Sequence, residues 1–191
     1  MNRSIRIIAG RWKGRRLEVP EGARPTLGRA REALFSIVQK RVPGALVLDL
    51  YAGSGAIGLE AVSRGAARAV LVEKEAGVLR RNLARLPPPR DQVEILAEDA
   101  EAAAQTLART GRRFDLVFAD PPYGLGSPAF HTRAGELAVS GGLVILQSES
   151  PGDTSPQLAA MSLVERRAYG RNVFLFYSHD PAARAARPAT F

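Results

Sequence analysis

The sequence has no cysteine, only two histidines and no apolar run that approaches the length of a membrane span. Without cysteine the chain has neither disulfides nor thiolate chemistry, and His131 and His179 are too few and too isolated for a usual metal cluster. A transmembrane helix needs about 20 mainly apolar residues, and the N-terminus also lacks the apolar region of a signal peptide. We therefore expect a cytoplasmic protein with no metal and no membrane partner.

Acidic residues are scarce in one part of the chain only. The net charge is +8, from 27 Lys and Arg against 19 Asp and Glu. Residues 1–41 hold eleven of those basic residues and three of the acidic ones, whereas residues 42–191 hold sixteen of each sign. The excess at the N-terminal end favours a polyanion as the partner of that segment.

The start of this basic segment predicts a β-hairpin. Residues 5–9 and 15–19 are typical of two short strands around Gly10-Arg11-Trp12-Lys13-Gly14, a turn that carries two positive charges and the only tryptophan. Such a turn suits contact with a nucleic acid. The alternative is that Trp12 folds back onto the core.

A helix over about residues 28–40 is expected after the hairpin. Thr26 is a reasonable N-cap, and an apolar stripe recurs at helical spacing, as in a helix that packs on a core. Arg29 and Arg31 lie off this stripe near the helix start. They could face phosphates, and a solvated helix face is the alternative.

A glycine-rich turn follows the next expected strand, residues 45–50. The sequence Gly53-Ser54-Gly55 with Gly58, and the acid Glu73 twenty residues beyond the first glycine, match the dinucleotide-binding fingerprint. However, Asp49 lies four residues before Gly53, where a carboxylate would repel a pyrophosphate but could hold the ammonium of an amino acid. The ligand suggested is a nucleoside that carries an amino acid, with Glu73 on its ribose hydroxyls.

A third acid follows the strand expected over residues 93–96. Asp99 could accept a hydrogen bond from the amino group of an adenine, and the Ala100 N–H could donate to the ring. The alternative is that Asp99 caps the Ala-rich helix over residues 101–109, and both roles can hold together.

A fourth acid, Asp120, closes the apolar strand expected over residues 114–119 and is followed by Pro121-Pro122-Tyr123. Two prolines restrict the backbone, so the aspartate and its neighbouring carbonyls are held in one extended arrangement. The Asp120 carboxylate and the Pro121 carbonyl could then accept hydrogens from a planar amine stacked on Tyr123. An ordinary proline-rich turn is the alternative.

Strands that alternate with helices predict a doubly wound α/β sheet. We expect a basic extension over residues 1–43, a main domain over 44–178 and a disordered tail over 179–191. The other expected elements are helices over about residues 57–64, 76–86 and 128–138, strands over 69–72 and 143–147, and a closing hairpin of 163–168 and 172–177.

The order of the motifs resembles the S-adenosylmethionine-dependent amino-methyltransferases. In that group successive motifs place the methionine, the ribose and the adenine of the cofactor, and then the target amine. The resemblance implies a seven-stranded Rossmann-like methyltransferase sheet with an antiparallel terminal hairpin, and S-adenosyl-L-methionine as the cofactor. It implies cofactor contacts for Asp49, Tyr51, Gly53, Ser54, Gly55, Glu73, Lys74, Asp99 and Ala100.

The N-terminal segment narrows this resemblance. Arg6-Ile7-Ile8-Ala9-Gly10, Lys13-Gly14-Arg15, Arg24-Pro25-Thr26 and Arg31-Glu32 are similar to the bacterial small-subunit (16S) ribosomal RNA guanine-N(2)-methyltransferase D family, nearly end to end. The resemblance implies methyl transfer to the exocyclic amine of a specific guanine in small-subunit ribosomal RNA, either naked or in a ribosomal particle. The target amine would be held by Asp120, Pro121, Pro122 and Tyr123. The RNA would be held by Arg6, Arg11, Trp12, Lys13, Arg15, Arg24, Arg29 and Arg31.

Three other functions stay open at this stage. A DNA adenine or cytosine amino-methyltransferase could use the same Asp-Pro-Pro-Tyr loop, although the chain has little room for a sequence-reading domain. An NAD-dependent oxidoreductase would share the glycine pattern, but Asp49 disfavours it. A non-catalytic RNA-binding or ribosome-assembly protein on the same fold is the third.

Overall fold

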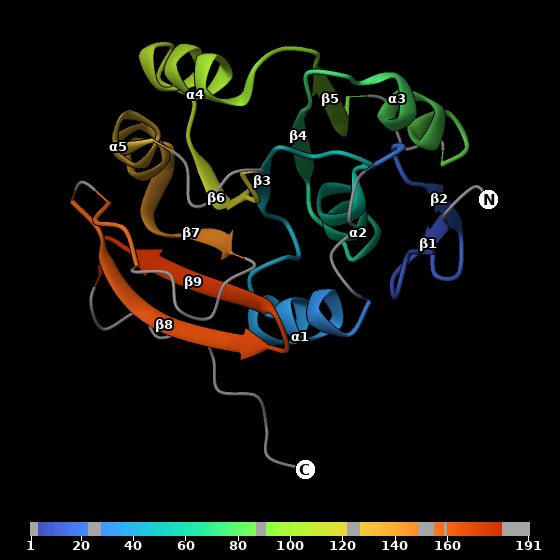
Figure 1. The fold of residues 1–191 in the computed structure, drawn as a ribbon, viewed down its shortest axis with the longest axis horizontal. Helices are drawn as coiled ribbons and strands as arrows, with labels where there is room; N and C mark the ends of the chain where they lie inside the picture. The colour runs from blue at the N-terminus through green and yellow to red at the C-terminus, as the bar shows by residue number, and fades with distance from the viewer. Residues whose placement is uncertain are drawn as a thin grey trace.

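A mixed seven-stranded sheet runs through the middle of the molecule, with helices on both of its faces (Figure 1). The computed structural model describes residues 4–22, 28–86, 91–121, 127–148, 155–158 and 160–180. The strands lie in the order β5-β4-β3-β6-β7-β9-β8. In chain order they are β3 (Leu46–Leu50), β4 (Arg68–Val72), β5 (Val93–Leu96), β6 (Phe114–Ala119), β7 (Ala138–Ser148), β8 (Ser162–Tyr169) and β9 (Asn172–Ser178).

Strands β3 to β7 are parallel, and β9 is antiparallel to both of its neighbours, β7 and β8. The chain proceeds from β3 outwards to β4 and β5 before it returns to the other side of β3 with β6. The sheet is therefore doubly wound with an antiparallel terminal hairpin, and the predicted fold class is confirmed. In such sheets the ligand crevice lies at the carboxyl ends of the strands beside the reversal.

Among the described residues, three helices pack on one face of the sheet and two on the other. α1 (Gly28–Val38), α2 (Ala56–Ser63) and α3 (Gly77–Ala84) share one buried cluster with Val47 of β3. α4 (Ala100–Arg109) and α5 (Pro128–Glu136) share the second cluster with Leu48 of the same strand. Successive residues of a strand point to opposite faces, so each parallel strand contributes to both cores. Burial on both faces explains why these strands are continuous apolar runs.

The element boundaries differ from the expected ones by more than two residues in two places. β7 begins at Ala138 rather than at residue 143, because its pairing with β6 continues past Gly141-Gly142 through an irregularity in register. Glycine is depleted in strands, so the composition of this segment does not predict one. In the N-terminal hairpin, β1 (Ser4–Arg6) and β2 (Arg16–Glu18) are shorter than predicted, because the N–H groups of Ile8 and Ala9 donate to the Glu60 carboxylate and not to the opposite strand.

The N-terminal hairpin is fastened to the end of α2. Ser63 Oγ donates a hydrogen bond to the Ala9 carbonyl (2.6 Å) and accepts one from the Trp12 N–H (3.0 Å). A Cβ at Gly10 would lie 1.8 Å from the Ser63 carbonyl oxygen, so this approach requires glycine. The Trp12 side chain is 8% exposed and lies in the same core as α1 and α2. This burial confirms the alternative that Trp12 folds back onto the core and corrects the expectation that it reaches out to a ligand.

Within the part of the chain that the structure describes, no helix is long and apolar enough to cross a membrane. The same residues contain no group of three or more His, Asp or Glu side chains placed to hold a metal ion.

Candidate active site

Acidic residues from four strands come together at one edge of the sheet. Leu50 of β3 pairs with Val72 of β4 and with Ala119 of β6. Val72 also pairs with Leu96 of β5. The carboxyl ends of these four strands therefore lie side by side, at the carboxyl edge where doubly wound sheets bind ligands. The acids that lie at or just beyond this edge are Asp49, Glu73, Asp99 and Asp120.

Asp49 is the most deeply buried of these acids. Its exposed fraction is 4%, and its Oδ2 accepts a hydrogen bond from the Gly58 N–H in the first turn of α2 (2.8 Å). Burial raises the pKa of the Asp49 carboxyl to about 7; the Gly58 hydrogen bond opposes this rise, and the charges of Asp120 and Glu73 add to it. A cation placed beside Asp49 would thus be attracted by three carboxylates at once.

Glu73 holds the glycine-rich loop that follows β3. Its Oε2 accepts a hydrogen bond from the Gly53 N–H (2.8 Å), so the acid after β4 and the loop after β3 are joined directly. Gly55 has a φ of 80°, and a Cβ there would lie 2.5 Å from Leu79 Cδ1, so the entry into α2 requires glycine. Lys74, which follows Glu73, is exposed.

Asp99 caps α4, which is one of the two roles that the sequence predicts for it. Its Oδ1 accepts hydrogen bonds from the backbone N–H groups of Glu101 (3.0 Å) and Ala102 (3.1 Å). Ala100, the first residue of α4, is buried. Because Oδ1 makes both capping bonds, the second carboxylate oxygen of Asp99 is not used by the cap.

Tyr51 lies at the start of the glycine loop and packs edge-on against Phe130 of α5, with the ring centres 5.8 Å apart. Its φ of 65° is in the left-handed region, which turns the chain sharply away from β3. Burial, together with the charges of Glu101 and Asp99, raises the pKa of the Tyr51 hydroxyl to about 12. The phenol is therefore neutral at physiological pH and can donate a hydrogen bond.

Asp120 and Pro121 directly follow β6. Asp120 is partly exposed, Pro121 is buried, and the Asp120 charge acts on Asp49. The carboxylate expected to hold a target amine therefore lies near the carboxylate expected to hold the cofactor. Pro122 and Tyr123 lie outside the described residues.

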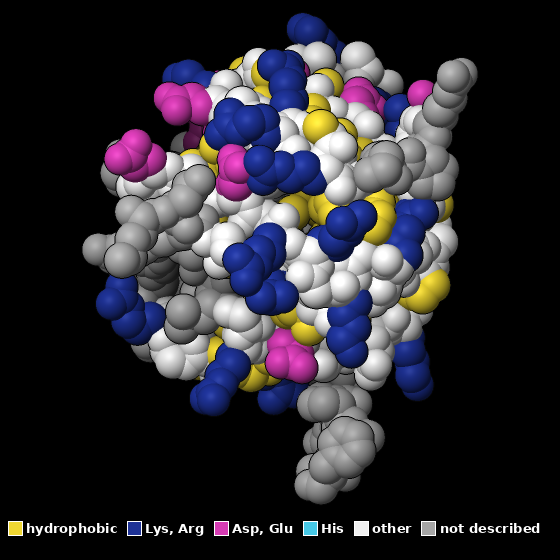
Figure 2. Space-filling view, turned by 90° about the vertical axis from the view of Figure 1, so that its right-hand side faces the viewer, with side chains coloured by type: hydrophobic (Ala, Val, Ile, Leu, Met, Phe, Trp, Pro, Cys, Tyr) yellow, Lys and Arg dark blue, Asp and Glu magenta, His cyan; other side chains and the backbone are white. Residues whose placement is uncertain are grey.

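Basic side chains are spread over the face formed by the hairpin and α3 (Figure 2). Arg11 is also engaged within the protein, because its guanidinium donates to the Val62 carbonyl (3.2 Å) and lies 4.8 Å from the centre of the Trp12 ring. Arg24 lies outside the described residues. The expected RNA contacts that are exposed are Arg6, Arg11, Lys13, Arg15 and Arg29.

Arg31 is buried, which corrects the expectation that it faces RNA. Its exposed fraction is 2%, its guanidinium donates to the Arg6 carbonyl, and its Nε lies 4.0 Å from the Glu60 carboxylate. Burial lowers the pKa of the Arg31 guanidinium, while the Glu60 charge opposes that change. Arg31 precedes Leu34 by three residues, a spacing that puts both on one face of α1. The spacing places Arg31 near the packed face of α1, but its burial depends on partners from the hairpin and from α2.

Glu60 of α2 is a structural residue that the sequence motifs do not reveal. It is fully buried, and its carboxylate accepts hydrogen bonds from the Ile8 N–H (2.7 Å) and the Ala9 N–H (2.9 Å) of the hairpin. It also pairs with Arg64 at 2.7 Å. A lone acid within an otherwise apolar helix is a signal for such a role, because a buried charge needs partners.

Asn82 of α3 is a second residue that the motifs miss. It is fully buried, its Oδ1 accepts from the Glu18 N–H (2.8 Å), and its Nδ2 donates to the Glu18 carbonyl (2.9 Å). The same Nδ2 donates to the carbonyl of Ser54 in the glycine loop (2.9 Å). Asn82 lies three residues after Leu79 and four before Leu86, so helical spacing already places it on the apolar face.

These side chains fit a ligand that carries a cation, a pair of hydroxyls and a heterocyclic base. The buried Asp49 suits the cation, because a positive charge would favour the ionised form that burial disfavours. Glu73 can accept from hydroxyls, and Asp99 keeps one carboxylate oxygen that the cap does not use. Asp120 and the Pro121 carbonyl follow the neighbouring strand β6 and could act as acceptors for a second molecule.

The chain matches a known family along most of its length. The profile of the family described as "Conserved hypothetical protein 95" matches residues 5–178. The protein named Ribosomal RNA small subunit methyltransferase D from Escherichia coli (strain K12) is 44% identical over 127 residues. That alignment covers 64% of this chain and 62% of the relative, so it spans less than two thirds of the relative's length.

Two solved structures have a similar fold. A hypothetical protein from Thermus thermophilus is 35% identical with a TM-score of 0.77, over 91% of this chain and 99% of that one. The T. thermophilus 16S rRNA N2 G1207 methyltransferase, solved with AdoMet and guanosine, is 22% identical with a TM-score of 0.64, over 94% of this chain and 50% of that one. The second likeness shows that the chain shares the fold of a methyltransferase.

Proposed function

The chain belongs to the bacterial small-subunit ribosomal RNA methyltransferase D family, whose profile is described as Conserved hypothetical protein 95, and from this membership we propose that it methylates ribosomal RNA. The proposed reaction moves a methyl group from S-adenosyl-L-methionine to the exocyclic N2 amine of a guanine in small-subunit ribosomal RNA. The observation that carries the proposal is the row of four acids at the carboxyl edge, with Asp120-Pro121 beside the buried Asp49.

S-adenosyl-L-methionine would supply a methyl group activated by its sulfonium centre. Asp49 would hold the ammonium of the cofactor, and the Gly53–Gly55 loop would lie along its methionine part. Glu73 would accept hydrogen bonds from the ribose hydroxyls, and Asp99 with the Ala100 N–H would bind the edge of the adenine. Tyr51, Ser54 and Lys74 border the same loop and complete the proposed cofactor contacts. The solved methyltransferase with AdoMet and guanosine supports this choice at the level of the fold.

Asp120 and the Pro121 carbonyl would act on the target amine. The exocyclic amine of guanine shares its lone pair with the ring and is a poor nucleophile. Two acceptors fixed at a strand end would take the two amine hydrogens and orient the nitrogen lone pair for in-line attack. Positioning of this kind can lower a barrier by about 7–11 kcal/mol in favourable cases. Because the thioether leaves as a neutral group, no general acid is required, and the proton of the amine is lost to Asp120 or to water.

The target base must be unstacked to reach Asp120. Unstacking costs a few kcal/mol in a duplex and less in a loop, and stacking on an aromatic ring such as that of Tyr123 returns about 1–3 kcal/mol. This balance favours an RNA loop as the target. In an assembled particle, ribosomal proteins would surround that loop, whereas naked RNA would present it alone.

A methyl-transfer assay tests the proposal. Radiolabelled S-adenosyl-L-methionine is offered with unmodified small-subunit ribosomal RNA, with the corresponding ribosomal particle and with unmethylated DNA, and the products are digested to nucleosides. We expect the label in N(2)-methylguanosine from RNA or from the particle. Label in DNA alone would favour a DNA amino-methyltransferase, and cofactor binding without any transfer would favour a non-catalytic RNA-binding protein.

Replacing Lys13 and Arg15 by alanine should weaken RNA binding and flatten its salt dependence. Both side chains are exposed near the hairpin turn, whereas Arg11 is partly engaged with Val62 and Trp12. Each phosphate contact contributes about 0.7–0.9 to the slope of log affinity against log salt, so the double variant should lose about 1.5. Filter binding at several salt concentrations measures the slope.

The matched control replaces Arg109 and Arg113, which are exposed at the end of α4 and just after it. This double variant loses the same two charges from a different part of the molecule, so its slope should stay close to the original value. If both double variants flatten the slope equally, binding follows net charge and the hairpin is not the contact surface.

A further inference from the structure

The cofactor loop and the basic hairpin are joined by one buried side-chain amide. The Nδ2 group of Asn82 donates one hydrogen bond to the Ser54 carbonyl of the loop and one to the Glu18 carbonyl of β2, both at 2.9 Å. Its Oδ1 accepts from the Glu18 N–H at 2.8 Å. Both amide hydrogens are used, and Asn82 is completely buried, so this connection is shielded from competing water.

We infer that Asn82 is a positioning residue that couples cofactor binding at the glycine loop to RNA binding at the hairpin, an inference that rests on the proposed function. Ser54 lies between Gly53 and Gly55, both in the left-handed region, so its carbonyl direction depends on the conformation of the loop. The backbone of Glu18 sets the path of β2. A ligand that orders either segment therefore orders the other through Asn82, and the second ligand meets a smaller ordering cost.

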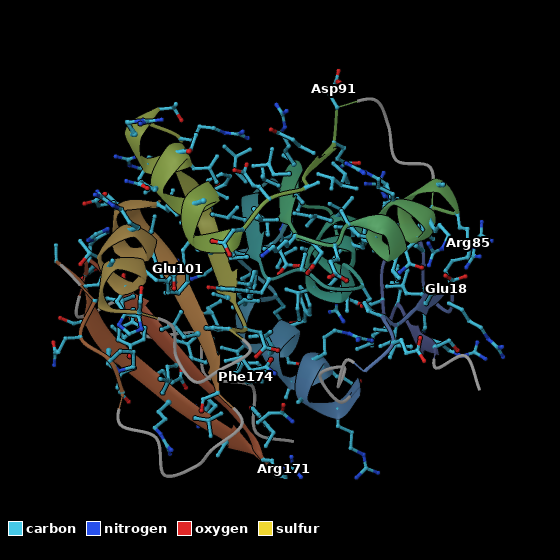
Figure 3. All side chains as sticks on the ribbon, turned by 45° about the horizontal axis from the view of Figure 1, so that its top comes forward. Glu18, Arg85, Asp91, Glu101, Arg171 and Phe174 are labelled. Carbon is cyan, nitrogen blue, oxygen red and sulfur yellow. The ribbon has the colours of Figure 1, made fainter. Side chains whose placement is uncertain are left out.

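The surroundings of Glu18 strengthen this connection. The Glu18 carboxylate pairs with Arg81 at 3.1 Å and with Arg85 at 2.6 Å, both from α3 or its C-terminal end (Figure 3). Glu18 is thus held by its backbone and by its side chain against the helix that carries Asn82. These two ion pairs are exposed and contribute little by themselves, so the buried amide is the stronger of the links.

The hairpin has a second attachment that bypasses the cofactor loop. Glu60 accepts from the Ile8 and Ala9 N–H groups, and Ser63 bonds to Ala9 and Trp12. These bonds hold the hairpin on the body of α2 and do not touch the loop from Gly53 to Gly55. A substitution at Ser63 should therefore loosen the hairpin without affecting its link to the cofactor loop, whereas a substitution at Asn82 should break that link.

Amide hydrogen exchange of the unmodified protein is the first test. Saturating S-adenosylhomocysteine, added without RNA, should slow exchange of the Gly53 and Glu18 amides more than exchange of the Ile8 and Ala9 amides. Slower exchange at Gly53 without an effect on Glu18 would overturn the inference. Equal slowing at all four amides would also overturn it, because that result describes global stabilisation.

The second test measures the coupling itself. Calorimetry gives the dissociation constant of S-adenosylhomocysteine with and without an unmodified small-subunit ribosomal RNA transcript. RNA should tighten binding to the unmodified protein about fivefold or more, the range of typical coupling between sites. Asn82→Ala should reduce this ratio to near one. Ser63→Ala, the matched control, should bind RNA more weakly but keep the ratio.

The outcomes distinguish this inference from the proposed function. If the unmodified protein does not bind S-adenosylhomocysteine, the proposed function fails and the coupling with it. If it binds both ligands but independently, or if Asn82→Ala keeps the full ratio, only the inference fails. Should Asn82→Ala not fold, the exchange pattern of the unmodified protein decides.

Discussion

Asp120→Ala is expected to lower methyl transfer to RNA by about 10³-fold or more while S-adenosylhomocysteine still binds with affinity within about threefold of the original. Loss of one preorganised polar contact at a reacting centre typically costs about 10²–10³ in rate, and here the alanine also removes the orientation of the amine. The cofactor contacts proposed for Asp49, Glu73 and Asp99 remain. Single-turnover transfer and calorimetry on the same preparation measure the two quantities.

The charge of Asp120 bears on this expectation in a second way. Asp120 contributes to the raised pKa of Asp49, so its removal favours the ionised Asp49 that would hold the cofactor ammonium. The variant thus loses the more distant carboxylate of Asp120, while the nearer carboxylate of Asp49 becomes more fully ionised. Because these two effects oppose each other, the affinity for the cofactor should change little. Equal losses of transfer and of cofactor affinity would contradict the role proposed for Asp120.

Asp115→Ala is the matched control for this experiment. Asp115 belongs to the same strand, β6, but its Oδ2 accepts from the Leu46 N–H at the opposite edge of the sheet (2.7 Å). Its replacement removes the same side chain and a hydrogen bond to the backbone, so stability should fall. Transfer per folded molecule should stay near the original value, since Asp115 is remote from the carboxyl edge.

Alternation of apolar runs with helical stripes was enough to predict the sheet and its ligand edge. Parallel strands buried on both faces are continuous apolar segments, and an acid lies at or just after the end of each of the four strands β3 to β6. Once the strands are parallel, their carboxyl ends must share one edge, so the sequence alone groups Asp49, Glu73, Asp99 and Asp120. The chemistry of these four residues follows from that edge and remains a proposal.

The links between the hairpin and the sheet could not be predicted in the same way. Trp12 and Arg31 are residue types that suit RNA, and their burial depends on how the hairpin and α1 pack onto α2. Composition favours an exposed arginine, and only the tertiary partners Glu60 and the Arg6 carbonyl make its burial tolerable. Asn82 bonds to Glu18, 64 residues away in the sequence, and to Ser54, 28 residues away. Local periodicity cannot predict pairings over such separations.

Asp49→Asn should make the ligand-free protein more stable at pH 8 and should weaken cofactor binding. The pKa of Asp49 is about 7 in the folded protein against an ordinary value of 3.8. A carboxyl whose pKa is raised by folding contributes stability that is complete below its unfolded pKa and is lost as the pH rises through its folded pKa. Asparagine cannot ionise, and its side-chain oxygen can still accept from the Gly58 N–H.

The expected gain follows from the size of this shift. A difference of about three pKa units corresponds to about 4 kcal/mol at pH 8, an upper limit because the site can relax when the carboxylate forms. The gain should shrink between about pH 7 and pH 4 and vanish below about pH 4, where Asp49 is protonated in both states. Denaturant unfolding of both proteins at several pH values measures the difference.

Ligand should reduce this difference in stability. Ionised Asp49 would attract the cofactor ammonium, so binding of S-adenosylhomocysteine to the unmodified protein should strengthen as the pH rises through about 7, whereas Asp49→Asn should lose about 10²-fold or more and show no such rise. Saturating ligand stabilises the tighter binder more, and an affinity difference of about 10²-fold corresponds to about 2.7 kcal/mol, so the gain of Asp49→Asn in denaturant unfolding at pH 8 should shrink by about that amount. A variant that is more stable and still binds the ligand with its original affinity would mean that the ammonium is held elsewhere. A variant that is less stable at every pH would mean that the charge of Asp49 is already compensated within the fold.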